Sequence, residues 1–188
     1  MFVPPTWIEG WLIQFGMFII IPLIVAIIVG LIVKKKKNSK ELTILSIVSS
    51  FILMGIIMMP VVSVYWHYAY ELPSVQEKVI TVEEWQPRPG IKYNTEGMMI
   101  IDNADQLMLL TTENEGFVNE ENLLFDKFNT RDILNNLKIN GTYKIKYYGW
   151  RNGFNSGFPN ILEVSEVIDE SNAVKTRNSE LFGVKFAN

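Results

Sequence analysis

The sequence predicts a membrane α-hairpin of two transmembrane helices, followed by a small, mainly β domain that resembles a five-stranded OB-fold barrel with one helix. Residues 11–33 and 42–64 are two 23-residue stretches without a charged side chain, and a group of lysines lies between them. Short runs of alternating apolar and polar residues then recur from residue 78 to residue 168. We therefore expect a hairpin over 1–70, a β domain over 71–168 and a polar tail over 169–188.

Each uncharged stretch is long enough to cross a bilayer as a helix. At a rise of 1.5 Å per residue, such a stretch spans about 34 Å, against a hydrocarbon core of about 30 Å. Backbone polar groups in lipid must be hydrogen-bonded within their own segment, so a helix is the expected form. With flanking aromatic residues included, the spans are about 11–33 and 42–66. The first ten residues carry Glu9 and no basic side chain, which does not fit a cleaved signal peptide.

The lysines between the spans set the expected topology. Lysine-rich short loops stay on the cytoplasmic side, so the loop 34–41 is expected inside the cell and both termini outside. A dedicated site for anionic lipids is the alternative interpretation. The five lysines are Lys34, Lys35, Lys36, Lys37 and Lys40.

Other residues of the hairpin favour an anchor. Tryptophans and tyrosines gather at the outer end of both spans, where their rings suit the headgroup layer, and the only histidine, His67, is interpreted as interfacial rather than catalytic. Two pairs of small residues, Ala26 with Gly30 and Ser46 with Ser50, are expected to let helices pack closely. Neither span holds a charged residue, whereas ion pathways usually need one.

Composition excludes several functions for the β domain. Residues 67–188 carry 12 Lys and Arg against 18 Asp and Glu, a net charge of −6, which makes a nucleic-acid partner unexpected. The chain has no cysteine, and it has no phosphate loop, dinucleotide fingerprint or nucleophile elbow. We therefore expect no cofactor, no metal and no enzymatic activity. The acidic pairs that keep an enzyme in view are Glu83 with Glu84, Asp102 with Asp105, and Glu120 with Glu121.

Five strands and one helix are expected after the hairpin. The strands cover 78–85, 98–102, 107–112, 142–148 and 161–168, with a polar loop over 112–116. The helix follows Thr130 as N-cap, places Ile133, Leu134 and Leu137 on one face, and stops before Gly141. Three strands, a helix and two strands are the order of an OB barrel. Other small β-rich sandwiches and α+β domains are alternatives.

One motif is distinctive. Residues 148–161 read Tyr-Gly-Trp-Arg, then a short loop with Phe and Ser, then Phe-Pro-Asn and an apolar strand. This pattern resembles a family of uncharacterised microbial proteins that are membrane-anchored and carry a small extracytoplasmic β domain. The resemblance covers about residues 142–168, and it implies a membrane location without implying an activity.

The same loop supplies the candidate ligand-binding residues. In OB barrels the loops joining strands one to two and four to five flank the binding face, and here these would be 86–97 and 150–159. Aromatic faces beside arginine suit sugar rings, bases or a protein surface. Alternatively, these aromatic residues plug the open end of the barrel, and the loop arginine pairs with a carboxylate. The candidates are Trp85, Arg88, Tyr93, Trp150, Arg151, Phe154 and Phe158.

Two function classes remain after these exclusions. The first is a membrane-anchored extracytoplasmic binding module, whose partner would be a membrane or envelope protein, an envelope polymer or another copy of the chain. The second is an accessory structural subunit of a larger membrane complex. Asn140-Gly141-Thr142 also matches a glycosylation acceptor, but Asn-Gly is equally expected in the turn after the helix.

Overall fold

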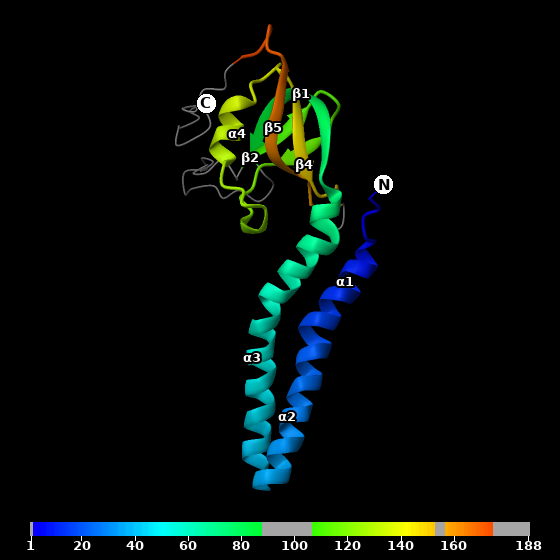
Figure 1. Cartoon of the computed structure of the whole chain (residues 1–188), viewed down its shortest axis with the longest axis vertical. Coiled ribbons are helices and arrows are strands. Elements are labelled where there is room, and N and C mark those ends of the chain that lie inside the picture. The colour runs from blue at the N-terminus through cyan, green and yellow to red at the C-terminus, as the bar shows by residue number, and fades with distance from the viewer. Residues whose placement is uncertain (1, 88–106, 153–156, 175–188) are drawn as a thin grey trace, which may run out of the picture. The chain divides into compact units, whose positions relative to one another are not determined.

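The chain divides into two compact units, Met1–Pro73 and Ser74–Asn188, which we call the helical unit and the β unit (Figure 1). The computed structural model describes residues 2–87, 107–152 and 157–174. The two units are described separately below.

The helical unit begins with one long, continuous helical stretch. It comprises α1 (Trp7–Phe15), a π-helical segment η1 (Gly16–Ile20) and α2 (Ile21–Lys37). Thr6 and Glu9 form a capping box at its start, which satisfies backbone donors that the first turn leaves unpaired. Pro22 follows the π-helical segment directly and has no N–H to donate, so the widened turn lies where a regular helix would be disturbed.

The turn between the long helices is shorter than expected. The chain leaves α2 at Asn38 in a left-handed conformation with φ 49°, and the Ser39 side chain accepts a hydrogen bond from the Leu42 N–H at 3.4 Å to cap α3 (Lys40–Trp66). The predicted loop 34–41 therefore reduces to these two residues. The lysines before it extend the last turn of α2, where the helix dipole favours positive charge.

The second helical stretch continues past α3 through η2 (His67–Glu71) and η3 (Leu72–Ser74). Trp7–Lys37 and Lys40–Ser74 are both long and apolar enough to cross a membrane. Only 17% and 6% of their most apolar windows are buried inside the structure, whereas a core helix of a soluble protein would be mostly buried. The helices therefore have the length and the outward-facing apolar surface of membrane spans.

Small residues lie where α2 and α3 run side by side (Figure 1). Ala26 and Gly30 of α2 are both buried. A Cβ atom added to Gly30 would lie 2.4 Å from Cγ1 of Ile47 on α3, so only glycine allows this approach. Ser46 and Ser50 are half-buried, and the Ser46 hydroxyl donates to the Thr43 carbonyl of its own helix at 2.8 Å.

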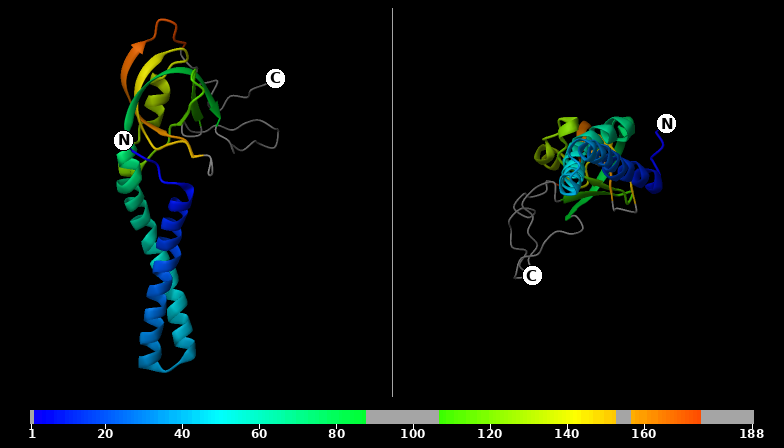
Figure 2. Two further views of the ribbon diagram at one scale, coloured as in Figure 1. Left: turned by 90° about the vertical axis from the view of Figure 1, so that its right-hand side faces the viewer. Right: turned by 90° about the horizontal axis from the view of Figure 1, so that it is seen from below.

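The β unit is built on a closed sheet (Figure 2). Within the described residues its strands are β1 (Gln76–Pro87), β2 (Leu107–Thr111), β3 (Gly116–Val118), β4 (Thr142–Tyr148) and β5 (Asn160–Asp169). Neighbours follow the order β1, β2, β3, β5, β4 and return to β1. All pairs are antiparallel except β3 with β5, which meet at Val118 and Asn160.

The long first strand belongs to both halves of the sheet. Its start pairs with β4 from Gln76 to Thr81, and its end pairs with β2 from Val82 to Pro87. The register shifts between Val82 and Glu84, where a β-bulge changes which side chains face inward. Val82 and Trp85 are therefore both buried, although a regular strand would put residues three apart on opposite faces.

The core of the β unit lies between this sheet and one short helix, α4 (Thr130–Asn136). Ile133, Leu134 and Leu137 are buried together, as the sequence predicts. Tyr143 and Ile145 of β4 are fully buried and Tyr147 packs beside them, so the predicted alternation of this strand is confirmed. The outward Lys144 and Lys146 pair with carboxylates of the neighbouring strands.

Some predicted boundaries are wrong. Residues 116–118 form β3, where the sequence predicts only the end of a polar loop, and 107–111 is the second described strand rather than the third. The predicted strand 98–102 lies outside the described residues. Thr130 is the first helical residue, and Asn129 stands at the N-cap without a side-chain cap. Val174 of the predicted polar tail pairs with Ile139 through two backbone hydrogen bonds.

Candidate functional site

A pocket of about 390 Å³ opens where the connection from β4 to β5 meets the hairpin of β2 and β3. Gly149 ends β4 with φ 84°, a left-handed conformation that glycine adopts without strain, and turns the chain toward the pocket. Three separate segments line the pocket: Gln76 at the start of β1, 114–117 around β3, and residues from Tyr147 to Pro159. The lining residues are Gln76, Asn114, Glu115, Gly116, Phe117, Tyr147, Gly149, Trp150, Arg151, Phe158 and Pro159.

Aromatic rings form the walls. The Phe117 and Tyr147 rings meet edge to face with centroids 5.1 Å apart, a favourable arrangement for aromatic pairs. The Phe158 ring rests on Gly116, where an added Cβ atom would lie 2.9 Å from ring atom Cε1. Glycine at 116 thus lets the loop ring approach the strand. Trp150 and Phe158 are both half-buried, so each keeps part of its surface toward solvent.

The positive charge at the pocket belongs to Arg151. Its guanidinium lies over the Phe158 ring, 3.9 Å from the centroid, and donates a hydrogen bond to the Gly157 carbonyl at 3.0 Å. The side chain is exposed, and the part of the chain that the structure describes contains no carboxylate within ion-pair distance of it. The guanidinium is therefore held in place while its charge stays available.

The negative charge at the pocket is already paired. Glu115 lies 2.6 Å from the Lys78 Nζ atom, and Glu113 lies 3.0 Å from the same atom. Hydrogen bonds from these two carboxylates raise the pKa of Lys78, first through Glu115 and then through Glu113. Burial raises the pKa of Tyr147, so its hydroxyl stays protonated at neutral pH. The pocket therefore offers apolar ring faces, one phenol and one cation.

The structure places the predicted ligand-binding residues in different settings. Trp150, Arg151 and Phe158 lie together at the pocket. Trp85 lies in the core instead: it is 6% exposed, and its indole N–H donates to the Leu137 carbonyl at 3.3 Å. The bulge in β1 turns this side chain inward. The other predicted residues, Arg88, Tyr93 and Phe154, lie outside the described residues.

Sequence reasoning missed the strand side of the pocket. Phe117 and Gly116 belong to β3, which is too short to give a periodic signal. Tyr147 was visible as an inward residue of β4, but nothing in the sequence placed it beside the loop. The aromatic content of 114–117 would have been a signal only if the hairpin of β2 and β3 had been recognised.

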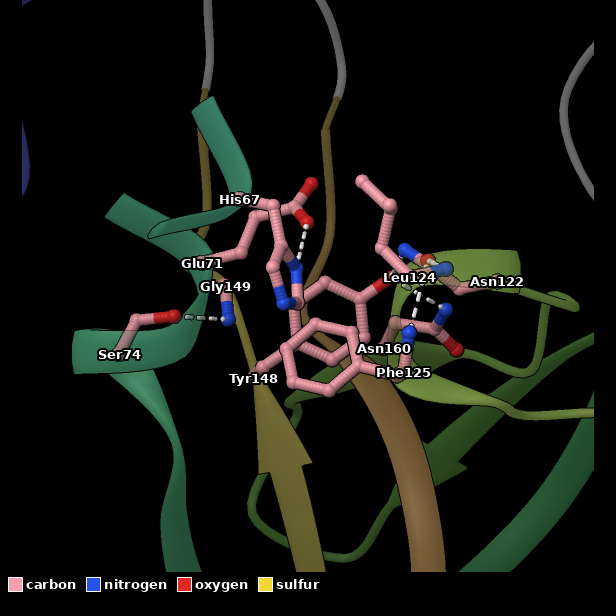
Figure 3. A network of polar contacts seen from close by, with 9 residues as sticks. All are labelled: His67, Glu71, Ser74, Asn122, Leu124, Phe125, Tyr148, Gly149 and Asn160. Carbon is pink, nitrogen blue, oxygen red and sulfur yellow. Dashed lines mark hydrogen bonds and ion pairs between the residues drawn. The ribbon is translucent and has the colours of Figure 1, made fainter. Parts of the chain in front are cut away.

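A second group of polar side chains is buried beneath the segment 119–128 (Figure 3). The Tyr148 hydroxyl accepts hydrogen bonds from the amides of Asn122 at 2.8 Å and Asn160 at 3.0 Å. The Asn160 amide also donates to the Glu120 carbonyl at 3.0 Å, and its Oδ1 accepts from the Glu120 N–H at 2.9 Å. These bonds satisfy polar groups that would otherwise be costly to bury.

Lys127 completes this group. Its Nζ atom donates to Oδ1 of Asn119 at 2.9 Å and to the Glu120 carbonyl at 2.6 Å, and the side chain is buried. Burial lowers the pKa of Lys127 to about 8. Because both hydrogen-bond acceptors are neutral, desolvation outweighs the stabilisation of the charged form.

Metal-binding and acidic candidates give little. The described residues contain no group of three His, Cys, Asp or Glu side chains that could hold a metal ion. Glu83 and Glu84 are neighbours on the exposed part of β1. In the helical unit, Nδ1 of His67 lies 3.2 Å from the Glu71 carboxylate, one helical turn away (Figure 3). Asn140 occupies the turn after α4 with φ 62° and is exposed.

Comparison of the chain with protein-family models, with curated proteins and with solved structures finds no match in any of the three.

Proposed function

We propose that this chain is a membrane-anchored extracytoplasmic binding module whose ligand site is the pocket at Trp150, Arg151 and Phe158. One observation carries the proposal: a single pocket gathers aromatic faces from a loop and two strands around a positioned arginine. Binding pockets in proteins are typically apolar and aromatic with a few fixed polar groups, and this pocket has that composition.

The proposed architecture of the module is an OB-like barrel. Two features support it: the order β1, β2, β3, β5, β4, and a long β1 shared between two partner strands. The helix α4 lies between β3 and β4 along the chain. OB barrels bind ligands on a face flanked by the connection between strands four and five, and here that connection carries Trp150 and Arg151.

The proposed ligand has a ring-shaped or planar apolar part and a negatively charged group. The ring faces of Trp150 and Phe158 suit the first part, and the Arg151 guanidinium suits the second. Nucleic acid is disfavoured by the net charge of −6 over residues 67–188. An acidic envelope polymer or a protein surface with an exposed carboxylate fits this description. The proposal is non-enzymatic because the carboxylate lining the pocket, Glu115, is tied to Lys78.

The proposed location follows from the lysines of the hairpin. With Lys34 to Lys37 and Lys40 in the cytoplasm, both termini and the β unit lie on the outer side. The bilayer is then the first partner of the chain, and tethering concentrates the pocket near other molecules of the same membrane. A weak site can therefore function without high intrinsic affinity.

The experiment is a capture from native membranes with the full chain in mild detergent. We expect a partner or polymer to be retained by the natural chain and lost by the Trp150→Ala/Arg151→Ala variant. Val79→Ala, an exposed change on β1 outside the pocket, is the matched control. Arg151→Lys keeps the charge without the planar guanidinium and is expected to bind less tightly.

Thermal unfolding of each variant separates binding from folding. Loss of capture with an unchanged melting temperature supports the pocket as a binding site. If the double variant unfolds, these side chains serve as a structural plug. If both variants capture the same material as the natural chain, the proposed site is wrong.

An accessory structural subunit of a larger membrane complex is the alternative. It needs helix surfaces that contact foreign helices, and the small residues of α2 were the candidates. Ala26 and Gly30 are instead covered within the hairpin, Gly30 by Ile47. Stoichiometric co-purification of other subunits, independent of Trp150 and Arg151, would favour this alternative.

A further inference from the structure

We propose that the segment Leu123–Phe128 of the β unit is a lipid-contact element that inserts into the headgroup layer of the membrane in which the chain is anchored. The proposal goes beyond ligand binding at the pocket and rests only on membrane anchorage. It starts from three apolar side chains that the β unit leaves in solvent: Leu123 is 79% exposed, Leu124 40% and Phe128 58%. Clustered exposed apolar residues usually mark an interaction site.

The exposure is held by structure. The Asn122 side chain accepts hydrogen bonds from the N–H groups of Leu124 at 2.9 Å and Phe125 at 3.4 Å, which fixes the short helix η5 (Leu123–Phe125). The Phe125 ring packs on the Tyr148 ring, with centroids 4.2 Å apart. Asn122 and Lys127 close the segment with backbone hydrogen bonds. The neighbouring leucines thus project outward while Phe125 turns inward.

The buried polar group described above is the foundation of this segment. Lys127 bonds Asn119 and the Glu120 carbonyl, and Asn160 of β5 bonds both backbone groups of Glu120. Burying a lysine against neutral acceptors is costly, and a surface loop without a function does not need such an arrangement. The result is a rigid apolar tip.

The tip lies at the end of the sheet where the chain arrives from the membrane helix. Asn122 bonds the Tyr148 hydroxyl, and the next residue, Gly149, donates its N–H to the Ser74 hydroxyl at 2.7 Å (Figure 3). Ser74 is the first residue of the β unit and the last residue of the helical stretch Lys40–Ser74. This chain of contacts lies wholly within the β unit.

The length of the tether selects the occupant. Ser74 follows Tyr70, a residue of the expected interfacial aromatic group, by four residues, or about 6 Å along a helix. An apolar tip beside Ser74 therefore lies within reach of the headgroup layer. The exposed Glu121 and Asp126 flank the tip, so its insertion is apolar and does not depend on anionic lipid. The occupant we propose is the bilayer itself.

The test uses the absence of cysteine from the natural chain. A single cysteine replaces Leu123, carries an environment-sensitive fluorophore, and is studied in the full chain reconstituted at one copy per phosphatidylcholine nanodisc. Val167→Cys is the matched control, because Val167 is also an exposed apolar residue, but β5 places it toward the opposite end of the sheet from Asn160. We expect spin-labelled phosphatidylcholine to quench the probe at 123 severalfold more than the probe at 167.

Further arms decide between the outcomes. Phe128→Ser, which removes a second apolar side chain of the tip, should reduce quenching at 123, whereas Trp150→Ala should leave it unchanged. The result should not depend on added phosphatidylglycerol or on salt. Equal quenching at 123 and 167 would overturn the proposal. So would shielding of position 123 from aqueous iodide without lipid quenching, because that result indicates a protein partner.

Discussion

The helical unit and the β unit use the same apolar side chains in opposite ways. Leu53 of α3 is 60% exposed, whereas Leu109 of β2 is fully buried. In the helical unit close packing depends on small residues such as Ala26 and Gly30, and the large residues face outward. In the β unit the large residues fill the core. The difference teaches that the expected solvent of each unit, lipid or water, decides where its apolar side chains go.

Replacing Trp85 tests the core side of this comparison and has the largest expected effect. Trp85→Ala should lower the free energy of unfolding by about 3–5 kcal/mol, because a fully packed aromatic side chain leaves a cavity. Trp150→Ala, at the half-buried pocket, should cost clearly less. Chemical denaturation of the full chain in detergent, followed by near-ultraviolet circular dichroism, measures both. Equal losses would contradict the separation of core and pocket.

Replacing Gly30 tests the helical side. Gly30→Leu should destabilise the hairpin by about 1–3 kcal/mol, because its Cβ atom would overlap Ile47. Gly55→Leu is the matched control: an added Cβ atom at Gly55 has no neighbour within 4 Å, and the gain in helix propensity is the same. Thermal loss of helical ellipticity in micelles compares the two variants. Equal stability would show that the α2 and α3 contact is not as close as described.

Raising the pH tests the buried lysine of the β unit. Lys127 has a pKa of about 8 in the folded chain and an ordinary value of 10.5, so between these values the unfolded chain holds more protons. The free energy of unfolding should therefore rise from pH 8 to 9.5, by at most about 1.4 kcal/mol per pH unit. Lys127→Met should abolish the rise. A stability that falls over this range would contradict the burial of the charge.

The opposite sign applies at higher pH. Burial raises the pKa of Tyr143 to about 12, so above pH 10 the folded chain holds more protons than the unfolded chain and stability should fall. The measurement of Lys127 is therefore confined to pH values below 9.5.

The smallest effect is expected at the surface of the β unit. Lys146 and Glu163 pair at 3.3 Å across β4 and β5, and both side chains are exposed. Lys146→Met should change the free energy of unfolding by less than about 1 kcal/mol, because water and salt screen such pairs. Urea denaturation at low and high salt checks this, and a loss as large as that of Trp85→Ala would show that the outward face is buried by something else.

The sequence predicts the hairpin well because its signal is repeated in every residue of two long stretches. The core face of α4 and the alternation of β4 are predicted for the same reason: Ile133, Leu134 and Leu137 follow the period of a helix, and Tyr143 and Ile145 follow that of a strand. Periodicity reports an element wherever it continues long enough.

Features without periodicity escape prediction. The three-residue β3 is too short, and the bulge at Val82 and Glu84 reverses the facing of Trp85, which alternation alone assigns to the surface. The pocket was therefore half predicted: its loop residues have a distinctive composition, but Gly116 and Phe117 arrive through tertiary pairing. The burial of Lys127 depends on Asn119 and the Glu120 carbonyl, which no local pattern of charge indicates.

The most direct test of membrane anchorage and sidedness is cysteine labelling in intact cells, for which the cysteine-free chain is a natural background. Thr112→Cys reports on an exposed turn of the β unit, and Lys36→Cys reports on the lysine-rich end of α2. We predict that a membrane-impermeant maleimide labels position 112 in intact cells and position 36 only after permeabilisation. Labelling of position 36 but not 112 in intact cells, or recovery of the chain in the soluble fraction, would contradict the account.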